Sequence, residues 1–214
     1  MNWALKACFR LQHSARDMVG DCRAIAATEF AVIVPIMLVM FFGTVEFSSA
    51  VAVDRKVTLM ARTLSDLTAQ SPPAGIADAD FVNYFSASVA IMTPYAADPT
   101  EATLSEIYID SKKVAKITWS TAATMPTGAL QAKLAASTRS PGDTVTPMIP
   151  DALLIPQTYL ILGEVTYLYQ PTIGYVMAKA GVNLSDVAYT RPRQNTCVIY
   201  TTKSLPPNGL CPLN

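Results

Sequence analysis

The most informative pattern in the chain is a long apolar stretch near its N-terminus. Residues 30–45 contain no charged side chain, and a glutamate lies at each end of the stretch, Glu29 and Glu46. A helix rises about 1.5 Å per residue, so this stretch covers roughly 24 Å. With the small residues at 24–28 it reaches the roughly 20 apolar residues that a bilayer core of about 30 Å requires. The pattern therefore predicts a transmembrane helix over 25–50.

The apolar pattern narrows after residue 50 without a break. Apolar residues then recur at alternating steps of four and three: Val53, Val57, Met60, Leu64 and Leu67. This spacing is typical of a helix with one buried face. Ser71-Pro72-Pro73 ends it, because proline disfavours helix in the residue before it. We expect one helix from about 25 to 69, its amphipathic extension covering 51–70, with a kink at Pro35 inside the span.

The remaining residues, 71–214, show the mixed patterns of an α+β domain. Asp78 is expected to cap a helix that ends before Pro94. One face of this helix carries four apolar residues: Phe81, Phe85, Val89 and Met92. The weak apolar spacing at 128–137 predicts another helix.

Alternating residues predict a small, mainly antiparallel sheet in this domain. Two strands, 104–110 and 114–120, are joined by a hairpin turn at 111–113. The strongest strand pattern is 158–169, which is apolar on both faces and should lie in the interior of the sheet. The pattern also predicts a loop, a short helix and a last strand, at 141–150, 173–179 and 197–201.

Composition and charge exclude some functions. The formal net charge is zero and only 15% of the residues are charged, so the basic surface that nucleic-acid binding requires is not expected. The leader, residues 1–24, carries more basic than acidic side chains, which places the N-terminus in the cytoplasm by the positive-inside rule. The domain after the span is then expected outside the cytoplasm, in the periplasm.

The four cysteines divide into two pairs on opposite sides of the span. Cys8 and Cys22 precede it and should stay reduced, whereas Cys197 and Cys211 follow it, where thiols oxidise. We expect a disulfide between the latter two, worth about 3 kcal/mol in the chain-entropy model; the alternative is two unpaired thiols. Neither pair has metal-binding spacing and His13 is the only histidine, so no metal or cofactor is expected.

Catalytic chemistry is also not expected. Serines and threonines are frequent after the span, but no histidine follows the span to activate them in the usual way. The tyrosines of 158–169 are expected to pack on the sheet rather than bind a small-molecule substrate. Arg191 and Arg193 are expected in a solvated loop. The chain is therefore not expected to be an enzyme.

Two short motifs flank the apolar stretch. A small-residue segment leads into an acid–aromatic pair, Ala24-Ile25-Ala26-Ala27-Thr28-Glu29-Phe30, and the stretch contains Pro35 and ends in Gly43-Thr44-Val45-Glu46-Phe47. In order and separation these elements resemble the TadE-like minor pseudopilins of the tight-adherence (Flp/Tad) type IVb pilus assembly system. Weaker similarity covers Ala188 to Arg193.

The resemblance implies a non-enzymatic protein held in the bacterial inner membrane that supports pilus assembly and surface adhesion. Its implied partners are other pilins and pseudopilins, components of the Tad secretion system, and a prepilin peptidase. Counting back from Glu29, the peptidase would cut between Ala24 and Ile25. Pilins usually carry glycine where this chain has Ala24, so cleavage itself stays open.

The glutamates have separate expected roles. A carboxylate at the edge of an apolar helix is costly unless paired, and such acids are functional candidates. We expect Glu29 to pair with the free amine of Ile25 on a neighbouring subunit; the alternative is a solvated residue at the lipid boundary. Glu46 is expected in water at the outer edge of the span, with contact to a partner helix as the alternative.

Two other interpretations fit the same residues. The chain could be an uncleaved bitopic envelope protein, or a secreted binding module released by signal peptidase after Ala50, since Ser48 and Ala50 are the small residues that this peptidase prefers. The mature N-terminus distinguishes all three interpretations: Ile25, Met1 or Val51.

Overall fold

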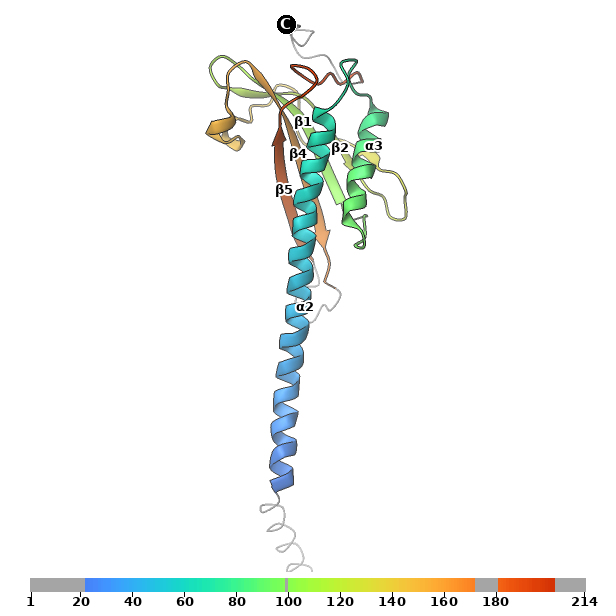
Figure 1. Ribbon diagram of the computed structural model, residues 1–214, viewed down its shortest axis with the longest axis vertical. Coiled ribbons are helices and arrows are strands. Elements are labelled where there is room, and N and C mark those ends of the chain that lie inside the picture. The colour runs from blue at the N-terminus through green and yellow to red at the C-terminus, as the bar shows by residue number, and fades with distance from the viewer. Residues whose placement is uncertain (1–21, 99, 172–180, 203–214) are drawn as a thin grey trace, which may run out of the picture.

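A computed structural model describes residues 22–98, 100–171 and 181–202 of the chain (Figure 1). One long helix, α2 (Cys22–Ala69), is followed by a second helix, α3 (Asp78–Val89), and a 3₁₀ turn, η1 (Ala90–Met92). Five strands follow: β1 (Thr100–Ile109), β2 (Ala115–Thr124), β3 (Lys133–Ala135), β4 (Thr158–Tyr169) and β5 (Val182–Thr190). Two short 3₁₀ turns, η2 (Thr146–Met148) and η3 (Asp151–Leu153), lie between β3 and β4. The α+β class is as the sequence predicts.

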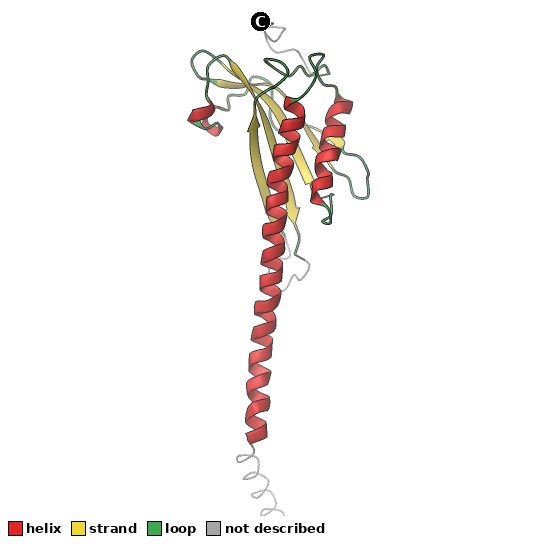
Figure 2. Cartoon of the chain, in the orientation of Figure 1, coloured by secondary structure: helices red, strands yellow, loops and turns green. Residues whose placement is uncertain are grey.

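Helix α2 is a single rod with two different surfaces. Its first half projects away from the domain (Figure 2), and its apolar side chains are exposed all round, Phe30 at 68% and Val39 at 60%. In its second half the predicted stripe is buried from Val53 to Leu64, while Leu67 is half-buried. Within the described residues, α2 is the one helix long and apolar enough to cross a membrane. The helix continues through Pro35, and the projecting half of α2 is drawn without a sharp bend in Figure 2.

The strands form one antiparallel sheet in the order β3-β2-β1-β4-β5. The β1–β2 hairpin is close to its predicted position, and its turn is held by Asp110, whose carboxylate accepts hydrogen bonds from the amides of Lys112 (2.7 Å) and Val114 (2.9 Å). Strand β4 lies between β1 and β5, as its two apolar faces predict. A register shift at Glu106 and Ile107 interrupts the β1–β2 pairing.

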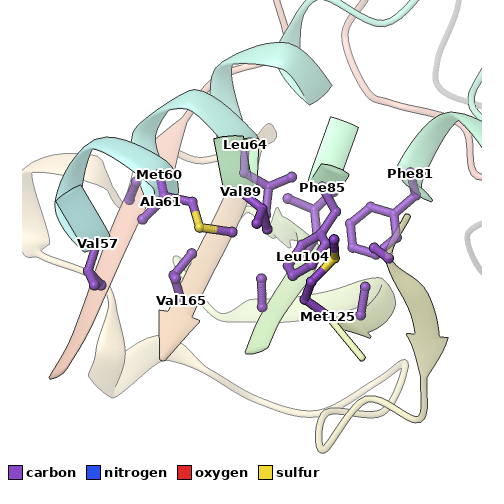
Figure 3. Packing of buried hydrophobic residues seen from close by; sticks show 14 of the residues in the cluster. Val57, Met60, Ala61, Leu64, Phe81, Phe85, Val89, Leu104, Met125 and Val165 are labelled. Carbon is purple, nitrogen blue, oxygen red and sulfur yellow. The ribbon is translucent and has the colours of Figure 1, made fainter. Parts of the chain in front are cut away.

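Each face of the sheet is covered by a different part of the chain. One face packs against α2 and α3 (Figure 3), and includes Leu104 of β1 and Val165 of β4. The opposite face carries Leu160 and Leu162 of β4 and is covered by Val145 and other apolar residues of the β3–β4 connection. The alternation of β4 between the two faces agrees with the sequence prediction.

Close contact between α2 and β4 depends on a glycine. A Cβ at Gly163 would lie 3.0 Å from the carbonyl oxygen of Ala61 and 3.2 Å from the Cβ of Ser65. The hydroxyl of Thr190 in β5 donates a hydrogen bond to that of Ser65 (3.1 Å). Beyond the helix end, the Arg193 amide donates to the carbonyl of Ala69 (2.8 Å). The second half of α2 is therefore fixed to the sheet.

Several predicted elements differ from the structure. Residues 128–137 are not a helix but contain β3, which pairs with Ala122 to Thr124 of β2. The helix cap is Ala77 rather than Asp78, and the carboxylate of Asp80 accepts a hydrogen bond from the Ala77 amide (2.8 Å). Asp78 instead accepts a hydrogen bond from the Tyr200 hydroxyl.

The last part of the domain was the least predictable. The strand expected at 197–201 is a single bridge between Ile76 and Tyr200. Strand β5 was not predicted, because its polar and apolar residues do not alternate clearly. The helix expected over 173–179 lies outside the described residues.

A fully buried carboxyl group anchors the segment that follows β5. Glu106, at the register shift of β1, accepts hydrogen bonds from the Thr118 hydroxyl (2.9 Å) and the Val198 amide (2.5 Å). The indole of Trp119 donates to the Val198 carbonyl (2.8 Å). Burial raises the pKa of Glu106 to about 8, although these hydrogen bonds oppose the shift. The carboxyl group thus links the sheet to the C-terminal segment.

Enlarging Gly163 should weaken the attachment of α2. We expect Gly163→Leu to lower the free energy of unfolding by about 1–3 kcal/mol, because the new side chain would collide with the helix backbone. Thermal unfolding of the full chain in detergent, followed by Trp119 fluorescence, measures this. Thr166→Leu, at an exposed position of the same strand, is the control. Equal unfolding temperatures for the two variants would contradict the assigned contact.

Glu106 should make stability fall with rising pH. The unfolded carboxyl ionises near 4.5 and the folded one near 8, so between these values the folded state binds more protons. The free energy of unfolding should then decrease by up to about 1.4 kcal/mol per pH unit from pH 5 to 8. Glu106→Gln can still accept the hydrogen bond from the Val198 amide through its one oxygen, while its NH2 group can donate to the Thr118 hydroxyl. Because it does not titrate, it should flatten this slope. Glu101→Gln, an exposed position of the same strand, should leave the slope as in the native chain.

Candidate functional site

The apolar part of the projecting helix, residues 25–45, carries one charged side chain. Glu29 is the only charged residue between 25 and 45, and its side chain is exposed among exposed apolar neighbours such as Phe30 and Ile33. Residues 25–45 extend about 30 Å in a helix, the thickness of a bilayer core. The arrangement gives a membrane anchor with a single carboxylate near its far end.

The expected cleavage position lies at the start of this helix. Ala24 and Ile25 both belong to α2, which begins at Cys22. Ile25 is 56% exposed, and it lies four residues before Glu29, on the same side of the helix. The hydroxyl of Thr28 donates to the Ile25 carbonyl (2.8 Å). Cleavage and the pairing of Glu29 with an Ile25 amine stay predictions.

Glu46 is not in water, contrary to the favoured interpretation. It is 3% exposed, and its Oε2 accepts a hydrogen bond from the Tyr169 hydroxyl (2.9 Å) at the end of β4. Burial, followed by this bond to Glu46, raises the pKa of Tyr169 to about 12. The sheet therefore reaches α2 at Glu46, about 25 Å along the axis from Glu29. Glu46 marks the point at which the bare helix meets the domain.

A basic side chain of α2 fastens the α3–η1 segment, which lies on the same face of the sheet, to this helix. The Lys56 ammonium donates hydrogen bonds to the carbonyls of Ile91 (2.7 Å) and Thr93 (2.8 Å), at the end of the α3–η1 segment. Arg193 forms an ion pair with Asp66, so it is not only a solvated loop residue. Together with the Gly163 contact, these interactions hold helix and domain as one unit.

Of the two cysteines in the predicted disulfide, only Cys197 is among the described residues. Cys197 is 1% exposed and is disulfide-bonded. Cys211 lies outside the described residues, as does Cys8. The pairing of Cys197 with Cys211 therefore stays a prediction.

Sequence reasoning missed the residues that join helix and domain. Tyr169 lies 123 residues after Glu46, and no local pattern connects them. Gly163 interrupts an apolar strand, which was the one available indication of close backbone approach. No local pattern connects Lys56 with its partners Ile91 and Thr93, 35 and 37 residues later. Their roles depend on how the sheet lies against α2.

The described residues contain no group of His, Cys, Asp or Glu that could hold a metal ion. The arrangement can hold and position a folded domain, because an apolar helix with one carboxylate is joined firmly to that domain.

Comparison with known proteins gives one result. No curated protein and no solved structure matches the chain. The family model described as TadE-like protein matches residues 24–64, from the expected cleavage position to the buried half of α2. The chain is therefore TadE-like over residues 24–64, in the helix that carries both Glu29 and Glu46.

Proposed function

We propose that this chain is a non-enzymatic, membrane-anchored minor pseudopilin that supports assembly of a tight-adherence pilus and thereby surface adhesion. The observation that carries the proposal is the exposed apolar half of α2 with its single carboxylate, within the TadE-like segment. TadE-like proteins are associated with the Tad pilus system.

The helix supplies the contact with other subunits. In lipid its apolar side chains have no hydrophobic reason to associate, so a polar group can select the partner. Glu29 provides this group: its carboxylate would pair with the Ile25 amine of a neighbouring pilin or pseudopilin. Water is excluded there, so the attraction is stronger than at a surface. The pair would fix the axial register of adjacent subunits.

Because the domain is joined firmly to α2, the axial register of the helices would also fix the position of the domain at the membrane surface. The contacts of Gly163, Lys56 and Glu46 with their partners join the domain to α2 at three heights. A subunit moved along its helix axis would therefore carry its domain with it. This rigidity supports a role in assembly over that of a flexible tether.

Topology and processing form part of the same proposal. The N-terminus lies in the cytoplasm, where prepilin peptidase cuts between Ala24 and Ile25, and the domain lies in the periplasm, where Cys197 pairs with Cys211. Release after Ala50 fits less well. Such a cut would break α2 within a continuous helix and remove Glu46 from its contact with Tyr169.

Glu29→Gln tests the assembly role. Loss of the charge should reduce incorporation into sheared pili at least tenfold, because the pairing with the Ile25 amine is lost, while the amount in the membrane fraction stays unchanged. Immunoblots of both fractions from the native host measure this. Asp54→Asn removes an exposed acid from the same helix and should incorporate normally. Normal incorporation of the Glu29 variant would refute the pairing.

N-terminal sequencing of the mature chain tests processing. The proposal predicts a start at Ile25, and deletion of the prepilin peptidase should restore a start at Met1. A start at Met1 in the native host would favour the uncleaved bitopic protein. A start at Val51 would show release by signal peptidase.

A further inference from the structure

A hollow lies where the domain meets the bare part of α2. It has a volume of about 520 Å³ and is bounded by residues of α2, of the segment after η1 and of the end of β4: Ser49, Tyr95, Asp98, Tyr167, Tyr169 and Gln170. Ser49 lies one helical turn beyond Glu46, where the apolar span ends. If residues 25–45 fill the bilayer core, the hollow lies at the level of the lipid headgroups. Tyrosine is enriched at this level, since its ring is apolar and its hydroxyl is polar.

The hollow is negatively charged and aromatic. Asp98 contributes an exposed carboxylate, and Glu46 lies behind Tyr169. The pKa of Tyr167 is raised by burial and then by the charge of Asp98. No lysine or arginine is among its described lining residues. These features disfavour a headgroup of net negative charge and favour one that carries an organic ammonium, which binds carboxylates and the faces of aromatic rings.

The Lys56 ammonium, which lies near Tyr95, does not change the preference of the hollow for an ammonium group. The Lys56 ammonium lies 6.0 Å from the centre of the Tyr95 ring. Its hydrogen bonds go to the carbonyls of Ile91 and Thr93, and Lys56 is not among the described residues that line the hollow. Asp98 is therefore the one charged side chain among the described residues that line the first hollow.

A second hollow continues from the first toward the membrane. It has a volume of about 420 Å³, shares Ser49 and Tyr95 with the first, and extends along α2 to Val45 and Thr44. Val45 is the last residue of the uncharged stretch. The two hollows together thus give a polar, negatively charged end at the headgroup level and a path along the helix into the lipid. A small water-soluble ligand would not need the second hollow, which lies along Thr44 and Val45.

We propose that these adjoining hollows bind an amine-bearing phospholipid, such as phosphatidylethanolamine, with the ammonium between Asp98 and the tyrosines and an acyl chain along Thr44 and Val45. The bound lipid would set the depth and orientation of the domain above the bilayer. The inference requires the membrane anchor but not pilus assembly, so the two proposals can fail separately.

Native mass spectrometry of the full chain in detergent tests the site. Short-chain phosphatidylethanolamine is titrated against phosphatidylglycerol with the same acyl chains. The native chain should bind the ethanolamine lipid at least about fivefold more tightly. Asp98→Asn can still accept the hydrogen bond from Thr127 (3.1 Å in the native chain), and should weaken ethanolamine-lipid binding about fivefold. Tyr95→Ala should weaken it about threefold.

Controls separate charge, fold and source of the ligand. Asp151→Asn removes an exposed acid in η3 and should bind as the native chain does. Glycerophosphoethanolamine, which has the headgroup without acyl chains, should not compete at equal concentration. Equal affinity of the native chain for both lipids, or unchanged binding by Asp98→Asn, would overturn the proposal. Competition by the soluble headgroup as strong as that by the lipid would overturn its assignment to the membrane.

Discussion

The packing of α2 against β4 and β5 is the interaction on which the rest of the structure depends. A helix satisfies its own backbone hydrogen bonds, so one continuous helix can be bare in lipid at one end and buried in a protein core at the other. The division between these environments is made by the sheet, which begins to cover the helix at Glu46. Gly163 allows the two backbones to come close, and the buried stripe of α2 completes the core of the domain. Without this contact the domain would lose one of its two layers.

Glu46 shows how a carboxylate is stabilised where the exposed half of α2 meets the buried half. A carboxylate at the end of an apolar span is stabilised by water or by hydrogen-bond donors, and here Tyr169 is one donor. The same tyrosine lines the hollow beside Ser49. Helix and sheet therefore meet at a single cluster of polar and aromatic groups, which the proposed topology puts at the membrane surface. The position of the domain above the bilayer follows from where this cluster lies along α2.

In the proposed pseudopilin, the two halves of α2 have separate roles. The far end offers one exposed carboxylate in an apolar environment, where a charged partner is recognised strongly. The half that follows Glu46 is fixed to the domain by Lys56, by the ion pair of Arg193 with Asp66 and by the Gly163 contact. Glu106 in turn fixes the segment around Val198 to the sheet by accepting a hydrogen bond from the Val198 amide. A displacement at the helix end would thus reach the outer surface of the domain.

The sequence by itself determined the long helix, its lipid-facing and core-facing halves, the β1–β2 hairpin and the interior position of β4. Each of these follows from a strong local period or from apolar residues on both faces of a strand. It also determined the TadE-like segment and singled out Glu29. Only the tertiary structure decided that Ala77 and Asp80 cap α3, that residues 133–135 join the sheet, and that Glu46 is buried under Tyr169. The physical reason is that burial of a polar group, and pairing of a short or weakly patterned strand, depend on partners far away in the chain, which no local period records.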